Sequence, residues 1–216
     1  MTRLRSMIWT AVFVAVAYQF LVIVPAILVS SLMPGISLIT LAGLANVLTV
    51  MVIYAYLNMR GVAWEVAEPG DMNLVVVGIA AAAAMVTVAL TTFLSGLLAA
   101  VFGSQGLSVS ESFVSQLHAA SRAELLFTIV LVAPFAEEFI YRGLFMGVLL
   151  ERGWTPLNAS GLAAVIFALQ HFQYGWIGIL MVLVYGLVLG LLRVASGGLF
   201  LPIMAHLFIN LISLAV

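Results

Sequence analysis

Residues 125–150 read LLFTIVLVAPFAEEFIYRGLFMGVLL, an apolar run long enough to cross a lipid bilayer that nevertheless holds two acids and one base. The three charged residues are Glu137, Glu138 and Arg142. An ionisable side chain at bilayer depth costs about 2.5–3.5 kcal/mol on insertion scales. Three of them on one helix therefore need partners or a chemical task. The stretch predicts a helix whose polar side chains face the inside of a helical bundle.

The composition of the whole chain places this helix in a polytopic membrane protein. Hydrophobic residues make up 65% of the 216 residues and charged residues 7%, whereas soluble domains carry about 25% charged residues. The formal net charge of -1 argues against a nucleic-acid partner. Cysteine is absent, which excludes disulfides, thiolate metal ligands and a cysteine nucleophile. We expect a single all-α domain over residues 1–216, a transmembrane helical bundle with the lipid bilayer as its surroundings.

Runs of near-spanning length predict about seven crossings. The run after Arg5 is longer than the apolar region of a signal peptide, so we expect a retained anchor. With seven crossings and Arg3 and Arg5 inside, Arg60, Arg152 and Arg193 also fall inside, and only Arg122 falls outside. The positive-inside rule then places the N-terminus in the cytoplasm. The expected runs are 7–32, 36–59, 74–102, 125–150, 159–175, 176–193 and 199–216.

Two local patterns predict details of the bundle. Ser108 and Glu111 have the spacing of a capping box, which predicts a short helix lying on the outer interface of the membrane. This helix is a plain connector or a gate over the site, and connectors are the commoner case. Gly186 and Gly190 have the small-residue spacing that lets two membrane helices approach closely.

Two further apolar runs carry the remaining polar groups of a candidate site. His171 lies in one run, and His206 and Asn210 lie in the other. Each helix residue advances 1.5 Å along its axis. Counted from the expected inner ends of the helices, these three residues and Glu137 fall in one layer, near mid-membrane or toward its cytoplasmic side.

The spacing on the charged helix separates its two carboxylates. Glu138 and Arg142 are four residues apart and share a face, so we expect an ion pair between them. Glu137 is turned about 100° away and has no partner on its own helix. The carboxylate of Glu137 is therefore the candidate general base that activates a water molecule.

His206 and Asn210 are also four residues apart, so an imidazole and an amide point the same way. Their N–H groups are candidates for an oxyanion hole, in which one donor is commonly worth about 3–4 kcal/mol. His171 is a candidate to orient the water or to bind a metal. Glu137, His171 and His206 together hold the donor atoms of a Zn²⁺ site. A metal-free reaction needs only the same groups, so both alternatives stay open.

Other intramembrane protease chemistries lack their residues here. Aspartyl proteases need two aspartates, and the chain has only Asp71, in a predicted loop. The zinc motif H-E-x-x-H and the serine-protease context G-x-S-G are missing from the sequence. An alternative from another class also stays open. In it, a transporter or scaffold uses the buried glutamates, histidines and arginine for proton relay or for locking helices together.

Three motifs in order resemble the CPBP family, also called Abi, which includes CAAX prenyl endopeptidases and bacteriocin-processing proteins. The resemblance covers a catalytic core over about 125–216, and each motif lies on a different predicted helix. Glu137-Glu138-Phe-Ile-Tyr-Arg142 is similar to E-E-x-x-x-R, Phe167-Ala-Leu-Gln-His171 to F-x-x-x-H, and His206-Leu-Phe-Ile-Asn210 to H-x-x-x-N.

The resemblance implies an integral-membrane endopeptidase of the CAAX protease-like type. In that family the first glutamate of the pair and the first histidine activate water, and the second histidine and the asparagine stabilise the oxyanion. The corresponding residues here are Glu137, His171, His206 and Asn210, with Glu138 and Arg142 as the supporting pair. Zn²⁺ dependence stays open.

The resemblance does not fix the substrate. The chain lacks lysine and is rich in alanine, leucine, valine and glycine, which fits a GC-rich prokaryotic source. Prenylated proteins are not expected there. We therefore expect a peptide or membrane-associated protein substrate at a prokaryotic cytoplasmic membrane.

Overall fold

The computed structural model of the chain describes residues 3–33 and 35–215. Within these residues the chain is helical, and its only strand-type pairing is an isolated bridge between Val109 and Tyr174. The all-α class is therefore confirmed. The elements in chain order are η1 (Leu4–Met7), α1 (Ile8–Leu32), α2 (Leu38–Met59), α3 (Ala63–Ala67), α4 (Leu74–Phe102), η2 (Ser104–Leu107), α5 (Glu111–Ala119), α6 (Arg122–Leu125), η3 (Leu126–Val132), α7 (Ala133–Glu138), η4 (Phe139–Phe145), α8 (Met146–Glu151), α9 (Pro156–Leu169), α10 (Trp176–Ser196) and α11 (Phe200–Ala215).

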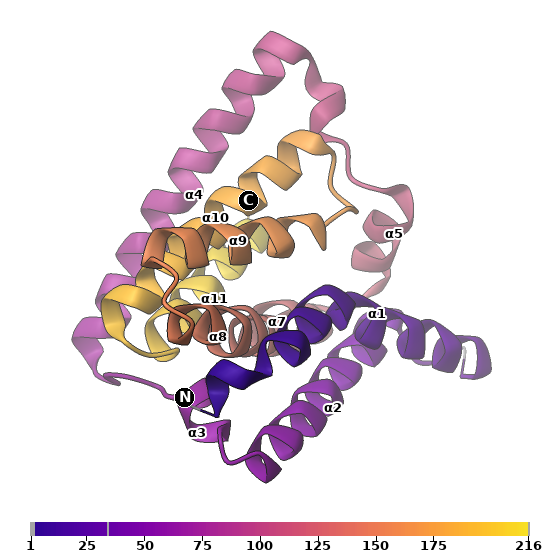
Figure 1. Cartoon of the computed structure of the whole chain (residues 1–216). Coiled ribbons are helices and arrows are strands. Elements are labelled where there is room, and N and C mark those ends of the chain that lie inside the picture. Colours follow the sequence, from indigo (N-terminus) through magenta and orange to yellow (C-terminus); the bar gives the residue numbers. More distant parts are fainter. Residues whose placement is uncertain (1–2, 34, 216) are drawn as a thin grey trace.

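Two groups of helices flank one central helical run, which consists of α6, η3, α7, η4 and α8 without a break. Helices α1 and α2 lie side by side on one flank (Figure 1). Helices α4, α9, α10 and α11 form the other (Figure 1). The central run contacts both groups, because η4 packs on α1 and α9 while η3 packs on α2 and α11. The stretch with the three charges therefore lies in the middle of the molecule.

Among the described residues, four helices are long and apolar enough to cross a membrane, as in an integral membrane protein. The three other expected crossings, in the runs 125–150, 159–175 and 199–216, do not form one long α-helix each. The central run is interrupted by changes of hydrogen-bond register, and α9 and α11 have 14 and 16 residues, fewer than the roughly 20 of a straight crossing. The four long helices are Leu4–Leu32, Leu38–Met59, Leu74–Phe102 and Trp176–Ser196.

The central run alternates between α and π hydrogen bonding, since η3 and η4 are seven-residue π-helical segments. In the first of them, Pro134 leaves one backbone carbonyl without a hydrogen-bond donor. The N–H of Ala133 donates to the carbonyl of Thr128, five residues back, so the next acceptor in that register is Ile129. Its donor would be residue 134, and proline has no N–H. The Ile129 carbonyl therefore lacks a backbone donor in this register.

Small residues bring neighbouring helices close together, as the spacing of Gly186 and Gly190 predicts. A Cβ atom on Gly186 would lie 3.0 Å from Ala164, and one on Gly190 would lie 2.8 Å from Ser160. Helices α9 and α10 thus pack with their backbones almost in contact. Gly143 plays the same part in η4, where a Cβ would lie 2.6 Å from a backbone carbonyl of α3.

The predicted short helix is present as α5, but its predicted capping box is wrong. Helix α5 begins at Glu111, and its N-cap residue makes no side-chain capping bond. The carbonyl of Ser108 instead accepts a bond from the N–H of Gly175 at 2.5 Å, so this segment is held extended against a loop. The capping box is formed further along, by Ser121 and Glu124 at the start of α6.

The loop after α3 holds the start of α11. The N–H groups of Leu199 and Phe200 donate to the carbonyls of Glu68 and Pro69, both at 2.9 Å. The first N–H groups of a helix have no acceptor within the helix itself. The loop supplies two such acceptors and so fixes the helix that carries His206.

Candidate active site

A buried ion pair lies at the centre of the molecule. Glu138 and Arg142 are both fully buried, and Arg142 Nη1 donates to Glu138 Oε1 at 2.7 Å. Arg142 Nη2 donates to the carbonyl of Gly186 at 2.9 Å. The guanidinium also lies over the ring of Phe167, 4.7 Å from its centroid. The predicted ion pair is therefore present, and it ties the central run to α9 and α10.

His206 joins this pair from α11. Its Nδ1 lies 2.8 Å from Glu138 Oε1, and its Nε2 lies 3.6 Å from Glu137 Oε2. An ionised carboxylate only accepts, so the proton of this bond is on Nδ1. Nε2 can then donate a hydrogen bond only when the ring is a protonated imidazolium. Glu138 thus positions His206 as well as pairing with Arg142, a contact the sequence analysis did not predict.

Glu137 has fewer contacts than the neighbouring carboxylate. Its side chain is 10% exposed, whereas that of Glu138 is fully buried. The distance of 3.6 Å to His206 is longer than a direct hydrogen bond. His206, Glu138 and Arg142 are nevertheless close enough to act on its charge electrostatically. The oxygens of Glu137 thus lie beside an imidazole without a direct hydrogen bond to it.

His171 lies beyond the end of α9, so the prediction of a helix over 159–175 is wrong at its C-terminal end. Helix α9 ends at Leu169, and His171 Nδ1 donates to the carbonyl of Phe167 at 2.8 Å. This bond satisfies one of the last helix carbonyls, which have no intrahelical donor. It also leaves Nε2 unprotonated in the neutral ring, able to accept a proton.

The ring of Phe167 connects the two histidines. Its centroid is 4.6 Å from that of His171 and 5.8 Å from that of His206. His171 is also stacked with Tyr174, at 6.1 Å between centroids and 8° between planes. The three motifs are therefore brought to one place, with Phe167 as their common contact.

Asn210 lies one turn after His206 on α11, and its Nδ2 donates to the carbonyl of Ile129 at 2.9 Å. This is the carbonyl for which Pro134 has no N–H. The Asn210 side chain thus replaces a missing backbone donor and fastens α11 to η3. A primary amide carries two N–H bonds, so one remains for another acceptor. The oxyanion role of Asn210 stays a prediction.

The candidate zinc ligands Glu137, His171 and His206 do not form a metal site. Over residues 3–33 and 35–215, no three His, Asp or Glu side chains are arranged to hold a metal ion. Nδ1 of His206 is engaged by Glu138 and Nδ1 of His171 by a backbone carbonyl, so only Nε2 of each ring is left as a possible ligand atom. The residues do not fit the ion in this arrangement, so no step through a metal is derived.

Two tyrosines and the amide of Asn46, to which the sequence analysis assigned no functional role, lie beside the cluster. The hydroxyl of Tyr18 donates to Asn46 Oδ1. The rings of Tyr18 and Tyr141 meet edge to face with centroids 6.0 Å apart. Glu137 acts electrostatically on both tyrosines. An asparagine inside an otherwise apolar run was the available signal, since such a residue needs a partner in lipid.

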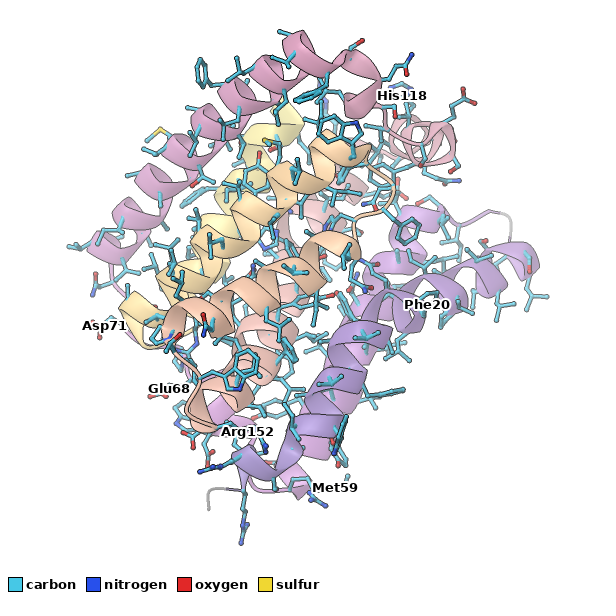
Figure 2. All side chains as sticks on the ribbon, turned by 45° about the horizontal axis from the view of Figure 1, so that its top comes forward. Phe20, Met59, Glu68, Asp71, His118 and Arg152 are labelled. Carbon is cyan, nitrogen blue, oxygen red and sulfur yellow. The ribbon has the colours of Figure 1, made fainter. Side chains whose placement is uncertain are left out.

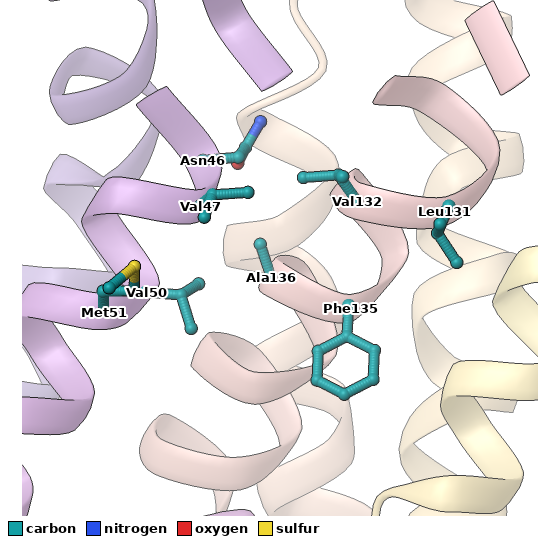
Figure 3. A pocket seen from close by; sticks show the side chains of 8 residues that line it. All are labelled: Asn46, Val47, Val50, Met51, Leu131, Val132, Phe135 and Ala136. Carbon is teal, nitrogen blue, oxygen red and sulfur yellow. The ribbon is translucent and has the colours of Figure 1, made fainter. Parts of the chain in front are cut away.

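Asn46 also lines an apolar groove of about 240 Å³ between α2 and the central run (Figure 3). The groove lies beside the helical turn that ends in Glu137, because two of its lining residues immediately precede that glutamate. The other lining side chains are all apolar: Val47, Val50, Met51, Leu131, Val132, Phe135 and Ala136.

Sequence comparison finds a family match within this part of the chain. Residues 119–212 match the family model described as type II CAAX prenyl endopeptidase Rce1-like. The matched segment contains all three motifs. The resemblance to the CAAX protease-like family is therefore confirmed over these residues.

Two curated proteins are each similar to about two fifths of this chain. One is an uncharacterized 24.3 kDa protein of Escherichia coli, 32% identical over 84 residues, which are 38% of this chain and 39% of that protein. The other is the uncharacterized protein YpbD of Bacillus subtilis (strain 168), 35% identical over 91 residues, 40% of this chain and 41% of that protein. The chain thus spans about two fifths of the length of these relatives. No solved structure matches the chain significantly.

Proposed function

We propose that this protein is an intramembrane endopeptidase that hydrolyses a peptide bond with a water molecule activated by Glu137. The family match supports a CAAX-type membrane protease in general. The observation that carries the mechanism is the position of Glu137. Its nearly buried carboxylate lies 3.6 Å from Nε2 of an imidazole that Glu138 holds from the other side.

In the proposed reaction, Glu137 takes a proton from water while the water oxygen bonds to the carbonyl carbon. The π electrons of the carbonyl move to its oxygen, which becomes an oxyanion. The imidazolium form of His206 and the second N–H of Asn210 donate to that oxygen. Glu137 then returns the proton to the departing amine as the C–N bond breaks. Nε2 of His171 accepts a hydrogen bond from the second O–H of the water.

Glu138 and Arg142 are positioning residues in this mechanism. Glu138 accepts from His206 Nδ1 and so fixes which nitrogen faces the reaction. A carboxylate orients an imidazole in the same way in serine proteases. Arg142 holds Glu138 in turn, through the bond of 2.7 Å.

The substrate we propose is a membrane-associated protein or a peptide, and it need not be prenylated. An apolar bundle around the site favours a substrate that partitions into the membrane. The proposed location is the cytoplasmic membrane of a prokaryote, with the N-terminus inside, as the distribution of arginines indicates.

The test is a comparison of protein termini in native host cells that carry the wild type or Glu137→Gln at matched abundance. Glutamine keeps the shape and removes the base. Glu111→Gln on α5 is the matched control, because it makes the same change outside the cluster. We expect new termini in the wild type and the control that are missing with Glu137→Gln. Identical termini in all three strains, with stably inserted protein, would refute the proposal.

A helix-locking scaffold is the second candidate, and one observation favours it. Glu138, Arg142, His206 and Asn210 all make hydrogen bonds inside the bundle. A scaffold requires these hydrogen bonds, but it does not require the carboxylate of Glu137, which makes no direct hydrogen bond to His206. It predicts that Glu137→Gln changes no termini and leaves the partners of the chain unchanged, so the same experiment separates the two functions.

A further inference from the structure

Two arginines converge on one pocket where η1 meets the end of α2. The guanidinium of Arg3 also lies over Gly61, where a Cβ atom would be 2.7 Å from its Nη1. Gly61 has a φ of +70°, so the turn after α2 favours glycine there. The pocket has a volume of about 340 Å³, and the residues that line it are Arg3, Ser6, Met59 and Arg60.

Neither guanidinium has a carboxylate partner among the residues that the structure describes. The positive-inside rule accounts for arginines at this end of the molecule. It does not account for one pocket being lined by two arginines, whose like charges repel each other. An anion between Arg3 and Arg60 would remove that repulsion and accept hydrogen bonds from both.

The pocket opens beside surfaces that are suited to lipid. Met59, which lines the pocket at the end of α2, is 78% exposed. Trp9 in the first turn of α1 is 81% exposed, and Phe13, one turn later, is 65% exposed. Tryptophan is enriched at membrane interfaces. Figure 2 shows Met59 and Arg152 at the same end of the molecule, and Arg152 donates to the carbonyl of Arg5 there at 3.3 Å. Positive charge and exposed apolar surface therefore adjoin.

We propose that this pocket binds the phosphate group of an anionic glycerophospholipid. The phosphate oxygens accept from Arg3 and Arg60, since guanidinium groups match phosphate geometry with paired N–H donors. The acyl chains lie along the exposed apolar faces of α1 and α2. Basic pockets between membrane helices are suited to such headgroups. This site does not depend on the proposed protease function.

The test uses Trp9 as a reporter in the full-length chain, with the other three tryptophans changed to phenylalanine. The protein is reconstituted into phosphatidylcholine vesicles containing a small fraction of brominated phosphatidylglycerol or the same fraction of brominated phosphatidylcholine. Bromine quenches tryptophan at short range. We expect the anionic lipid to be enriched at Trp9 by about 10-fold over phosphatidylcholine, as two surface arginines allow. Equal quenching by the two lipids would overturn the proposal.

Variants identify the residues responsible. Arg3→Gln with Arg60→Gln should lower quenching by the anionic lipid to the phosphatidylcholine level. Arg122→Gln is the matched control, because Arg122 is an exposed arginine at the start of α6. It should leave the preference unchanged, and an equal loss in this control would show general surface charge and overturn the site.

A third arm separates the two sources of phosphate. Inorganic phosphate added to the vesicles should not displace the brominated lipid, whereas full displacement would show a site for free phosphate and overturn the lipid assignment. Native mass spectrometry of the unmodified protein is the second measurement. It should retain phosphatidylglycerol in preference to phosphatidylcholine, and loss of that preference in the wild type would also contradict the proposal.

Discussion

The buried cluster around Arg142 and the pocket between Arg3 and Arg60 use the same side chain in opposite ways. Arg142 is fully buried and bonds to Glu138 and to a backbone carbonyl. Arg3 and Arg60 lie at the end of the molecule, line an open pocket and have no carboxylate partner in the described chain. In a membrane interior a charge persists only with partners from the same bundle. At the interface water solvates the guanidinium, which leaves it available to a ligand.

The largest expected difference between the two regions is in stability. Arg142→Met should cost about 3–5 kcal/mol in free energy of unfolding, because Glu138 is left as a buried charge without its cation. Arg60→Met should change it by less than about 0.5 kcal/mol, as exposed substitutions do. Denaturant unfolding in detergent micelles measures both values.

A paired variant sharpens this result. Replacing Glu138 with Gln in the Arg142→Met background removes the unpaired charge, so the double variant should be more stable than Arg142→Met alone. Equal costs for Arg142→Met and Arg60→Met would show that burial does not distinguish the two arginines.

The next effect concerns the bond between Asn210 and Ile129. Asn210→Ala should cost about 1–2 kcal/mol, the scale of interhelical hydrogen bonds in model membranes. Pro134→Ala restores an N–H that can donate to the Ile129 carbonyl, so Asn210→Ala should cost less in that background. A double-mutant cycle measures the coupling. Strictly additive costs would show that Asn210 does not replace the donor that Pro134 lacks.

A smaller loss of stability is expected for the buried hydrogen bond between the neutral side chains of Tyr18 and Asn46. Tyr18→Phe removes the hydroxyl that donates to Asn46, at a cost of about 0.6 kcal/mol, the average measured for hydrogen bonds between membrane helices. Thermal unfolding in the same micelles measures it. Adding Asn46→Leu should recover part of the loss, since no unpaired amide oxygen then remains. A further loss in the double variant would contradict this account.

The smallest effect lies outside the membrane-spanning helices and depends on pH. Ser37 and Thr40 donate to Glu124, and together with the backbone N–H of Ser121 they lower the pKa of this carboxyl to about 2. A folded-state pKa below the unfolded value of 4.5 stabilises the fold above that value, and the gain is lost as pH falls toward 2.

Melting temperatures test this sign directly. Between about pH 6 and pH 3, the wild type should lose more thermal stability than Glu124→Gln. Glu111→Gln is the control, and it should follow the wild type. A wild-type curve that is parallel to that of Glu124→Gln would show that these bonds do not favour the ionised form.

Local spacing was enough to predict only part of the site. The bond between Glu138 and Arg142 follows from the helical period alone, which is why it could be predicted. The contact of His206 with Glu138 depends on how α11 packs against the central run, and no spacing within either helix contains that information. Likewise, the apolar pattern around His171 continues past the point where α9 ends, so it could not show that the histidine lies in a turn.

The alternation of α and π hydrogen bonding in the central run could not be predicted from the sequence either. α and π segments have similar apolar patterns over seven residues, and the choice between them is made by packing. Pro134 within the apolar run was a usable signal, because it removes a helix bond. It does not reveal that Asn210, far away in sequence, fills the gap at Ile129.

The bond between His206 and Glu138 joins residues 68 positions apart, and the carbonyls that hold the start of α11 lie still earlier in the chain. During synthesis, Glu138 and Arg142 therefore enter the membrane while His206 is still being made. The ion pair needs nothing later in the chain and can form at once. The imidazole arrives only when α11 docks, so a growing chain carries the proposed base before it carries the group that completes the reaction. With the proposed mechanism, emerging chains would be inactive toward their neighbours until α11 has docked.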